Sequence, residues 1–500
     1  MSDRRDGVDA SPSKGPGISL KSWKDGIAPA FLALGLNVVY LDRLAPTTLL
    51  VGGLAPAIVG AILGGLLAYW CLYYVPAMWG VRTRQSVSVV ASSTFGIRGA
   101  LLVSSMLTVA IHIVWFAVTI EYAAQYSLSG LVSCGLLDAK NLASNHRGSW
   151  AVPKPLFLAV AASWSIASAV IGTLAVRLVS AVLSAYIVFP ALVIGALVVW
   201  AMPTVVSGPI DTMPFTQGGG RALISMVQLI FAFLAAQSLT NIEWGAVTST
   251  ERDVRNGGLV GIMLTMPLVA ILSLLIVAGS LGRTQQTPLP LGNSRSAPMT
   301  GRLDVARELP AITIPGSRNR GGPTLREALL NGLGGRLGGT ALLILALAML
   351  GPACTNPFQI AQQLSGLWPG IPRWAWALAG AFATWPLILS GWSKDLESVF
   401  GVLGAIAAPV MGAISADFAR SQGVWRGPCK GVNVAGYGAW VAGVGAAAAI
   451  AYWGQTMLVT RYLPSSVVGF ATAFGVYLIL SAIKRERVAA TPAIPVAGLE

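Results

Sequence analysis

Long apolar segments dominate this 500-residue chain and recur from residue 27 to residue 483. An α-helix needs about 20 apolar residues to cross the hydrocarbon core of a bilayer. Twelve segments meet or approach that length: 27–42, 47–76, 99–133, 155–175, 177–202, 222–247, 257–281, 328–358, 373–390, 397–416, 432–454 and 463–483. The chain is therefore predicted to be an all-α polytopic membrane protein with about 12 transmembrane helices.

The composition excludes an ordinary soluble domain and an outer-membrane barrel. Only 10% of the residues are charged, 55% are hydrophobic, and the mean hydropathy is +0.70. In a soluble domain, roughly a quarter of the residues are charged. A barrel would show short segments of alternating hydropathy instead of continuous apolar runs. Four scattered cysteines and two histidines imply neither a disulfide framework nor a zinc site.

The apolar segments divide the chain into a tail at 1–26, a transmembrane domain at 27–483 and a second tail at 484–500. The first tail is polar and lacks the apolar core of a cleaved signal peptide, so a flexible cytoplasmic tail is expected. Within the domain, 283–326 is rich in Pro, Gly, Ser and Arg and has no aromatic residue. It is predicted to be disordered or to lie on the surface. A tolerated insertion is favoured there over an anion-binding or regulatory role.

The formal charge of +14 comes from Lys and Arg residues that lie mostly in loops. In a membrane protein such residues set the orientation, so they do not indicate a nucleic-acid partner. Outside 283–326, the positive excess falls on the loops that are internal when the N-terminus is internal. We therefore expect a multi-pass protein of the cell membrane with both termini cytoplasmic.

Polar side chains gather at the end of the sixth segment, where hydrocarbon offers no hydrogen-bond partner. The cluster consists of Gln237, Ser238, Thr240, Asn241 and Glu243. It predicts an unwound stretch that lines a water-filled cavity.

The first and eighth segments are interrupted as well. The first contains Gly35 and Asn37, and the eighth is predicted to be broken by Pro352 and Pro357. Broken helices at corresponding places in two halves indicate a transporter binding site. The first and sixth segments lie five segments apart, which is the spacing of an inverted five-helix repeat (5+5) followed by two extra helices.

The third segment places His112, Trp115 and Thr119 on one helix face, at i, i+3 and i+7. Trp115 either offers a flat surface to a planar ring or packs between helices. For His112, a hydrogen bond to a neighbouring helix is favoured over a functional role. Glu121 and Gln125 lie toward the outer end, where solvation is favoured.

A more specific signal comes from the stretch APVMGAISADFARSQGVWRGPCKGVNVAGYGAW. Its Pro409–Gly412 turn, its Ala416-Asp417-Phe418 step, its basic loop 420–430 and its Asn433–Gly436 helix start resemble the nucleobase:cation symporter-1 family, closest to its cytosine permease-like group. SVVASSTFGIRGA resembles that family's loop before the third span. NIEWGAVTSTERDVRNGGLVGI resembles the family's join of the sixth and seventh spans. The resemblance covers about 20–485, apart from the insert.

The resemblance implies a monomeric secondary transporter that imports a planar nucleobase or related heterocycle such as a hydantoin, allantoin or a vitamin ring. Family members stack the ring on a tryptophan at the position of Trp115, and often carry Gln where Thr119 stands here. The candidates for reading the edge of the ring are Asn37, Gln237 and Asn241.

The resemblance also implies a coupling ion, either Na⁺ or H⁺, and no covalently bound cofactor. The family's Na⁺ site aligns with the Gly351 carbonyl and with the side chains of Cys354 and Thr355. A thiol is a poor ligand for a hard cation, so H⁺ coupling with Glu243 as carrier stays open. Glu243 could instead form a salt bridge with Arg252 or Arg255.

Two further expectations concern residues away from the substrate. Asp417 and Arg420 are predicted to form a gating or packing salt bridge at a cytoplasmic helix end. An amino-acid or osmolyte carrier of the same fold and a non-transporting sensor remain as alternatives. An intramembrane enzyme is disfavoured because the chain lacks a clustered nucleophile, acid and base, and an ATP-driven pump because it lacks a phosphate-binding loop.

Overall fold

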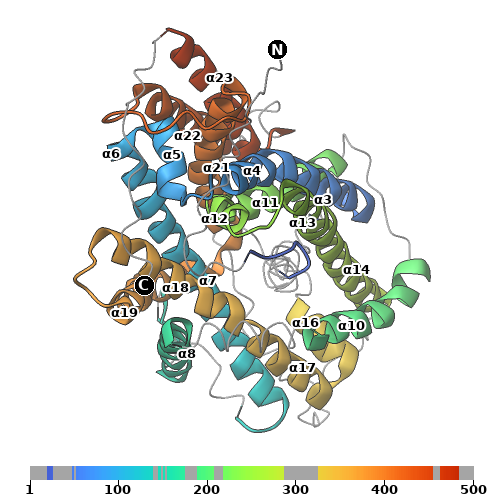
Figure 1. Ribbon diagram of the computed structural model, residues 1–500. Helices are drawn as coiled ribbons and strands as arrows, with labels where there is room; N and C mark the ends of the chain where they lie inside the picture. The colour runs from blue at the N-terminus through green and yellow to red at the C-terminus, as the bar shows by residue number, and fades with distance from the viewer. Residues whose placement is uncertain are drawn as a thin grey trace, which may run out of the picture.

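The computed structural model describes residues 20–25, 48–49, 52–138, 145–147, 150–152, 155–174, 188–207, 218–286, 325–453 and 462–483. Apart from its connections, the described chain is helical except for one short antiparallel pair of strands, β1 (Asn145–Arg147) and β2 (Trp150–Val152), and an isolated parallel bridge between Lys21 and Thr248. Figure 1 shows α7 running through the middle of the molecule, with α18 beside it. The predicted all-α fold is confirmed.

Ten helical stretches in the described residues are long and apolar enough to cross a membrane. The second predicted segment consists of α3 (Leu54–Ala68), η2 (Tyr69–Tyr74) and α4 (Val75–Thr83), and the third consists of α6 (Ile97–Ala100), η3 (Leu101–Met106) and α7 (Leu107–Ser133). The fourth is α8 (Pro155–Leu174) and the fifth is α10 (Val188–Ser207). The sixth consists of α11 (Gly219–Gln237) and α12 (Thr240–Ala246).

The seventh segment consists of α13 (Glu251–Gly258), η6 (Leu259–Leu264) and α14 (Thr265–Gln286), and the eighth consists of α17 (Gly335–Ala348) and α18 (Leu350–Leu367). The last three segments are α21 (Leu396–Arg420), α22 (Val434–Trp453) and α23 (Ser465–Ile483). Shorter elements are α5 (Val87–Phe95), α16 (Leu325–Leu333), α19 (Arg373–Ala383), α20 (Trp385–Leu389) and η7 (Trp392–Lys394).

Two of the twelve predicted segments are not among these ten. The first, with Asn37, lies outside the described residues, as does most of the insert 283–326. The ninth is present as α19 and α20, which meet at Thr384, so neither piece is long enough to cross alone. Pro386 in the first turn of α20 fits a helix start, because proline needs no hydrogen-bond acceptor there.

The contacts between helices are those that an inverted repeat produces. The contact of α7 with α8 has its counterpart, five segments later, in α18 with α19. Likewise, α8 with α18 corresponds to α19 with α7, and α10 with α14 corresponds to α21 with α4. The two extra helices, α22 and α23, pack on α21 (Figure 1). The pairing agrees with the predicted 5+5 arrangement and its two additional helices.

The sixth segment is interrupted where its polar residues cluster. A two-residue turn at Ser238 and Leu239 separates α11 from α12. The Ser238 hydroxyl donates to the carbonyl of Ala235 at 2.6 Å, and the Thr240 hydroxyl donates to the carbonyl of Gln237 at 2.7 Å. These hydroxyls occupy carbonyls near the break, as a helix end in an apolar interior requires. The predicted interruption of the sixth segment is confirmed, but Ser238 and Leu239 keep right-handed helical dihedral angles, so the stretch is not unwound as predicted.

The eighth segment breaks earlier than predicted. α17 and α18 meet at Met349, and α18 continues through Pro357. Pro352 lies in the first turn of α18, where a missing N–H costs nothing. The prediction that Pro352 and Pro357 break this helix is therefore wrong by one to two turns.

Part of the first tail is bound to the helices rather than flexible. The N–H of Lys21 donates to the carbonyl of Val247 at 3.0 Å, and its carbonyl accepts from the N–H of Ser249 at 2.9 Å. The N–H of Trp23 donates to Asp253 at 3.4 Å. The segment 20–25 thus pairs with the connection between α12 and α13, which corrects the expectation for these residues of the tail.

Candidate functional site

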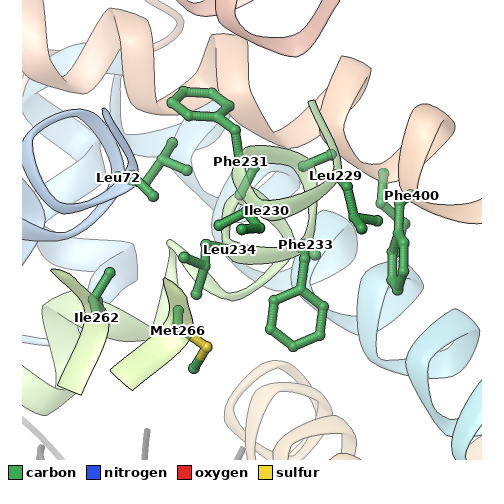
Figure 2. Close-up of a cluster of buried hydrophobic side chains, with 14 of the residues drawn as sticks. Leu72, Leu229, Ile230, Phe231, Phe233, Leu234, Ile262, Met266 and Phe400 are labelled. Atoms are coloured by element: carbon green, nitrogen blue, oxygen red, sulfur yellow. The ribbon is translucent and has the colours of Figure 1, made fainter. Parts of the chain in front are cut away.

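Three aromatic rings from three helices meet in the core of the molecule. Trp115 of α7 contacts Phe233 of α11 edge-on, with ring centroids 5.0 Å apart, and Phe400 of α21 at 5.3 Å. Phe233 and Phe400 contact one another at 5.7 Å. Figure 2 shows both phenylalanines beside Leu229, on neighbouring helices. Trp115 is 8% exposed, so its ring is packed between helices in this conformation.

The side chain of Thr119 lies one turn after Trp115 and is buried. Its hydroxyl donates to the Trp115 carbonyl at 2.8 Å, so only its lone pairs remain for a ligand. A glutamine at this position could offer both a donor and an acceptor, whereas Thr119 offers an acceptor alone.

His112 lies one turn before Trp115 and joins α7 to α18. Its Nδ1 lies 2.9 Å from the amide oxygen of Asn356, and the amide nitrogen of Asn356 donates to the Pro352 carbonyl at 2.8 Å. The same carbonyl accepts from the Thr355 hydroxyl at 3.1 Å. The favoured interpretation of His112, a hydrogen bond to a neighbouring helix, is confirmed.

Several buried polar atoms of this region have no hydrogen-bond partner. On α7 these are the Thr108 hydroxyl, His112 Nε2 and Trp115 Nε1, at i, i+4 and i+7 on one face. Gln359 Oε1 on α18 and Asn241 Oδ1 on α12 are also without a partner. Buried polar groups are nearly always paired, so unpaired ones point to a missing ligand or water.

The edge-reading candidates of the sixth segment differ in their surroundings. Asn241 is buried, and its amide nitrogen donates at 3.1 Å to the carbonyl of Leu72 in the π-helical segment η2. A π-helical turn displaces carbonyls from the regular ladder, which makes such a carbonyl available to a side chain. Gln237 is partly exposed at the last position of α11. Asn37 lies outside the described residues.

The residues aligned with a Na⁺ site lie on the first turns of α18. Gly351 and Cys354 are buried, and Thr355 is exposed. The Thr355 oxygen donates its proton to Pro352, so its lone pairs remain available to a cation. Cys354 supplies sulfur where oxygen would suit Na⁺ better. Among the described residues, no group of three or more His, Cys, Asp or Glu could hold a metal ion.

Glu243 contacts α18 instead of the arginines of α13. Its carboxylate accepts from the amide nitrogen of Gln363 at 3.2 Å. In the described part of the chain, the ion pairs within 4.0 Å include Arg82 with Glu251 and Lys394 with Glu121, and none joins Glu243 to Arg252 or Arg255. The alternative in which Glu243 pairs with Arg252 or Arg255 is therefore wrong in this conformation, and the partner of the carboxylate is neutral.

Asp417 lies near the C-terminal end of α21, whereas Phe400 of the aromatic cluster lies near the start of the same helix. Asp417 contacts α5. Its carboxylate accepts from the hydroxyls of Ser93 and Thr94 at 2.8 and 2.9 Å. The Arg420 carbonyl accepts from Arg426 at 2.8 Å. The contacts with α5 bring together two stretches of sequence, SVVASSTFGIRGA and the α21–α22 connection, that lie more than 300 residues apart.

The third stretch that resembles the symporter family, NIEWGAVTSTERDVRNGGLVGI, contains the α12–α13 connection and lies at the same end of the bundle as Asp417. Arg82 binds Glu251 at 2.9 Å and the carbonyl of Gly423 at 3.0 Å. Arg84 donates to carbonyls of residues 246–249, at 2.9 Å for Ala246 and 2.8 Å for Ser249. Burial lowers the pKa of the Arg84 guanidinium from its usual value. The two arginines thus tie α4 to three other segments.

A buried ion pair lies farther along α7. The carboxylate of Glu121, 0% exposed, lies 3.5 Å from Nζ of Lys394 in η7, whose side chain is 26% exposed. Glu121 also accepts from Gln125 at 2.6 Å. The expectation that Glu121 is solvated is wrong, because the connection between α20 and α21 covers it.

Sequence reasoning missed Phe233, Phe400 and Lys394. Phe233 lies in an apolar run where it resembles any lipid-facing residue, and Phe400 lies at the start of one, where the polar residues Glu397 and Ser398 mark a helix end rather than a site. Lys394 was one of many loop lysines and arginines. The one indication of the ion pair in the sequence was Glu121 itself. A carboxylate inside a membrane-spanning segment requires a partner, although the sequence does not say which residue supplies it.

Comparison with known proteins identifies the fold. No protein-family model and no curated protein matches the chain. Solved structures that share its fold include Mhp1 in an inward-facing conformation (TM-score 0.58, 12% identity, 94% of both chains). They also include Mhp1, a nucleobase-cation-symport-1 family transporter, in a closed conformation with bromovinylhydantoin bound (TM-score 0.55, 15% identity, 94% of this chain and 95% of that one). A Na⁺-coupled sialic acid symporter in a substrate-bound outward-open state is a further example (TM-score 0.56, 10% identity, 94% of this chain and 91% of that one).

Proposed function

We propose that this chain is a secondary transporter that imports a small planar heterocycle of the nucleobase, hydantoin or allantoin type, coupled to Na⁺ or H⁺. The observation that carries the proposal is the meeting of Trp115, Phe233 and Phe400 beside unpaired polar atoms of α7 and α18. Aromatic faces hold planar rings, and unpaired donors and acceptors hold their edges. The shared fold with Mhp1, whose closed structure holds a hydantoin, supports this assignment.

In this proposal Trp115 is the stacking surface, and Thr119, Gln237, Asn241 and Asn37 read the edge of the ring. Phe233 and Phe400 cover the Trp115 ring in the present conformation. A substrate reaches Trp115 when one of these phenylalanines moves aside. Such a movement of α21 or α11 relative to α7 is the local form of alternating access, in which the site opens to one side at a time.

We also propose that 27–483 works as a monomeric transport unit in the cell membrane, with both termini cytoplasmic. The contacts of Arg82, Arg84 and Asp417 then lie at the cytoplasmic end, where they hold that end closed in this conformation. Asp417 and Arg420 belong to this closure rather than to the substrate site. The insert 283–326 lies on the other side of the membrane in this orientation.

Ligand binding to the purified protein tests the substrate class. Cytosine, adenine, uracil, hydantoin and allantoin are compared with proline, alanine and betaine by the shift in thermal unfolding that each produces. At least one heterocycle is expected to raise the unfolding temperature, because a ligand that binds only the folded state stabilises it. Stabilisation by amino acids or betaine, and by none of the heterocycles, would contradict the proposed substrate class. It would favour the alternative, an amino-acid or osmolyte carrier of the same fold.

Replacement of Cys354 by Ser tests the ion site. The hydroxyl supplies the oxygen ligand that the native thiol lacks, and Na⁺ prefers oxygen. Cys354→Ser is therefore expected to increase the stimulation of uptake by Na⁺ several-fold, measured with Na⁺ or K⁺ outside at constant pH. Cys354→Ser with Thr355→Val is the matched control, and it should return the stimulation to the native level. An unchanged Na⁺ response in Cys354→Ser would remove Gly351, Cys354 and Thr355 from the coupling site.

Glu243 is proposed as the proton carrier if the native protein ignores Na⁺. Its carboxylate is partly buried and has a neutral amide partner, an arrangement that allows protonation without breaking an ion pair. Glu243→Gln is expected to preserve ligand binding and to make the uptake rate insensitive to a pH gradient. Gradient-driven uptake at the native rate in Glu243→Gln would exclude this role.

A further inference from the structure

His112 carries a hydrogen-bond acceptor that no other group uses. The amide nitrogen of Asn356 donates to the Pro352 carbonyl at 2.8 Å, so the amide oxygen is the atom that faces His112 Nδ1. The ring therefore donates from Nδ1, and a neutral imidazole that donates from Nδ1 presents a lone pair at Nε2. His112 is 3% exposed, and Nε2 has no partner.

The hydrogen bond to Asn356 explains the orientation of the ring but leaves Nε2 unexplained. A side chain that served only to join α7 to α18 needs one polar atom, and an asparagine would supply it. An unpaired acceptor in a buried position is unfavourable, because it has lost water without gaining a donor. Val109, Ile360 and Leu364 at this seam are apolar. The two groups near them that could donate, the Thr108 hydroxyl and Nε1 of Trp376, form no hydrogen bond with Nε2.

The unpaired Nε2 belongs to a stripe rather than standing alone. Thr108 and Trp115 lie one turn before and one turn after His112, and each has a buried polar atom without a partner. α7 runs antiparallel to the consecutive helices α17 and α18, since His112 meets Asn356 of α18 and Gly130 meets Gly339 of α17. Gln359, one turn after Asn356, therefore lies at the level of Thr108. Its Oε1 is unpaired as well.

We propose that His112 is a specificity-determining residue: its Nε2 accepts a hydrogen bond from a ring N–H of the transported heterocycle. The substrate class is narrowed to neutral rings that carry an N–H at the edge, as lactams, ureides and nucleobases do. Trp115, on the same stripe, brings the ring close to His112, and Thr108 and Gln359 line the same seam. Asn356 acts as a positioning residue, because it selects the tautomer that leaves Nε2 as an acceptor.

Two substitutions separate the acceptor from the link between the helices. Asparagine in His112→Asn places its amide nitrogen where Nδ1 stood, so it keeps the donor to Asn356 and lacks an atom at the position of Nε2. Glutamine in His112→Gln places an amide oxygen near the position of Nε2 and loses the donor to Asn356. Both variants are first checked for native elution and unfolding temperature in detergent, and His112→Gln is expected to be the less stable of the two.

The probes are uracil and hydantoin with their N1-methyl and N3-methyl derivatives, as competitors of the best labelled ring. For the native protein and His112→Gln, one methylated position is expected to weaken competition about tenfold, the effect of losing one neutral hydrogen bond. In His112→Asn, competition by the parent ring is expected to be about tenfold weaker than in the native protein, and competition by that methyl derivative is expected to be unchanged. The parent and the derivative should then compete equally well.

Because a hydrogen bond from the substrate presupposes the transport function proposed above, the two failures must be distinguishable. Absence of competition by every ring in the native protein would contradict the transport function itself. Heterocycle competition in which His112→Asn retains the native preference for the parent ring over that one methyl derivative would overturn the role of His112 alone. A changed pH profile in His112→Asn with that preference intact would also overturn it, and would assign the ring to proton binding.

Discussion

Trp115→Ala is expected to abolish uptake of the heterocycle while the protein still reaches the membrane. The substitution removes the surface on which the ring stacks, and loss of an aromatic stacking partner costs about 1–3 kcal/mol of binding free energy per ring. In affinity, the upper end of that range is more than about a hundredfold. The measurement is the initial rate of uptake of labelled substrate in cells, normalised to the amount of protein in isolated membranes.

Two controls accompany this variant. Trp115→Phe keeps an aromatic face and is expected to retain a substantial part of the uptake. Trp374→Ala removes a tryptophan of α19 that is more than half exposed, and it should transport at the native rate. Native uptake by Trp115→Ala would remove Trp115 from the substrate site and leave it as a packing residue between α7, α11 and α21.

The second large effect concerns the stability of the ion pair of Glu121 and Lys394. Removing one partner of a buried ion pair leaves the other charge uncompensated and costs several kcal/mol. We expect about 2–3 kcal/mol for Lys394→Gln, which leaves the buried Glu121 carboxylate without a cation, and a smaller loss for Glu121→Gln, because water can reach the partly exposed Lys394 that remains. Each single variant should unfold at a clearly lower temperature in detergent, and the double variant should recover much of the loss.

Glu251→Gln is the matched control for this experiment. It removes the same type of group from an ion pair with Arg82 whose two side chains are 42% and 36% exposed. Exposed pairs contribute about 0–1 kcal/mol, so its unfolding temperature should stay close to the native value. Equal losses of stability in Glu121→Gln and Glu251→Gln would contradict this prediction. So would a loss in the double variant, Glu121→Gln with Lys394→Gln, that equals the sum of the two single losses, because it would show that the two charges do not stabilise one another.

The sequence was most informative where physical chemistry permits few solutions. Long apolar segments in a chain with few charges favour membrane-spanning helices, and ten of the twelve form helices that are long and apolar enough to cross. The dense polar cluster at 237–243 favours an interrupted helix, and α11 ends within it. The break in the eighth segment was misplaced, because a proline marks a helix start as readily as a break. Pro352 is the former, and the choice depends on where the preceding helix ends.

The candidate site could be predicted only in part. Trp115, Thr119 and His112 were identified by their spacing on one helix, and spacing is a local property that the sequence contains. Their partners could not be identified, because Phe233, Asn356 and Phe400 lie 118 to 285 residues away in sequence. The pairing of Glu121 with Lys394 was missed for the same reason. Which apolar residues face one another follows from helix packing, which hydropathy does not encode.

The most direct test of the transport function is uptake by the purified protein in sealed liposomes. Labelled cytosine, uracil, adenine, hydantoin and allantoin are supplied outside, with an inward Na⁺ gradient, an inward H⁺ gradient, both or neither. The account predicts that at least one ring accumulates above its outside concentration when the coupling gradient is imposed, and merely equilibrates without it. Failure of every ring to accumulate under any gradient, by a protein that elutes as a native monomer, would contradict it.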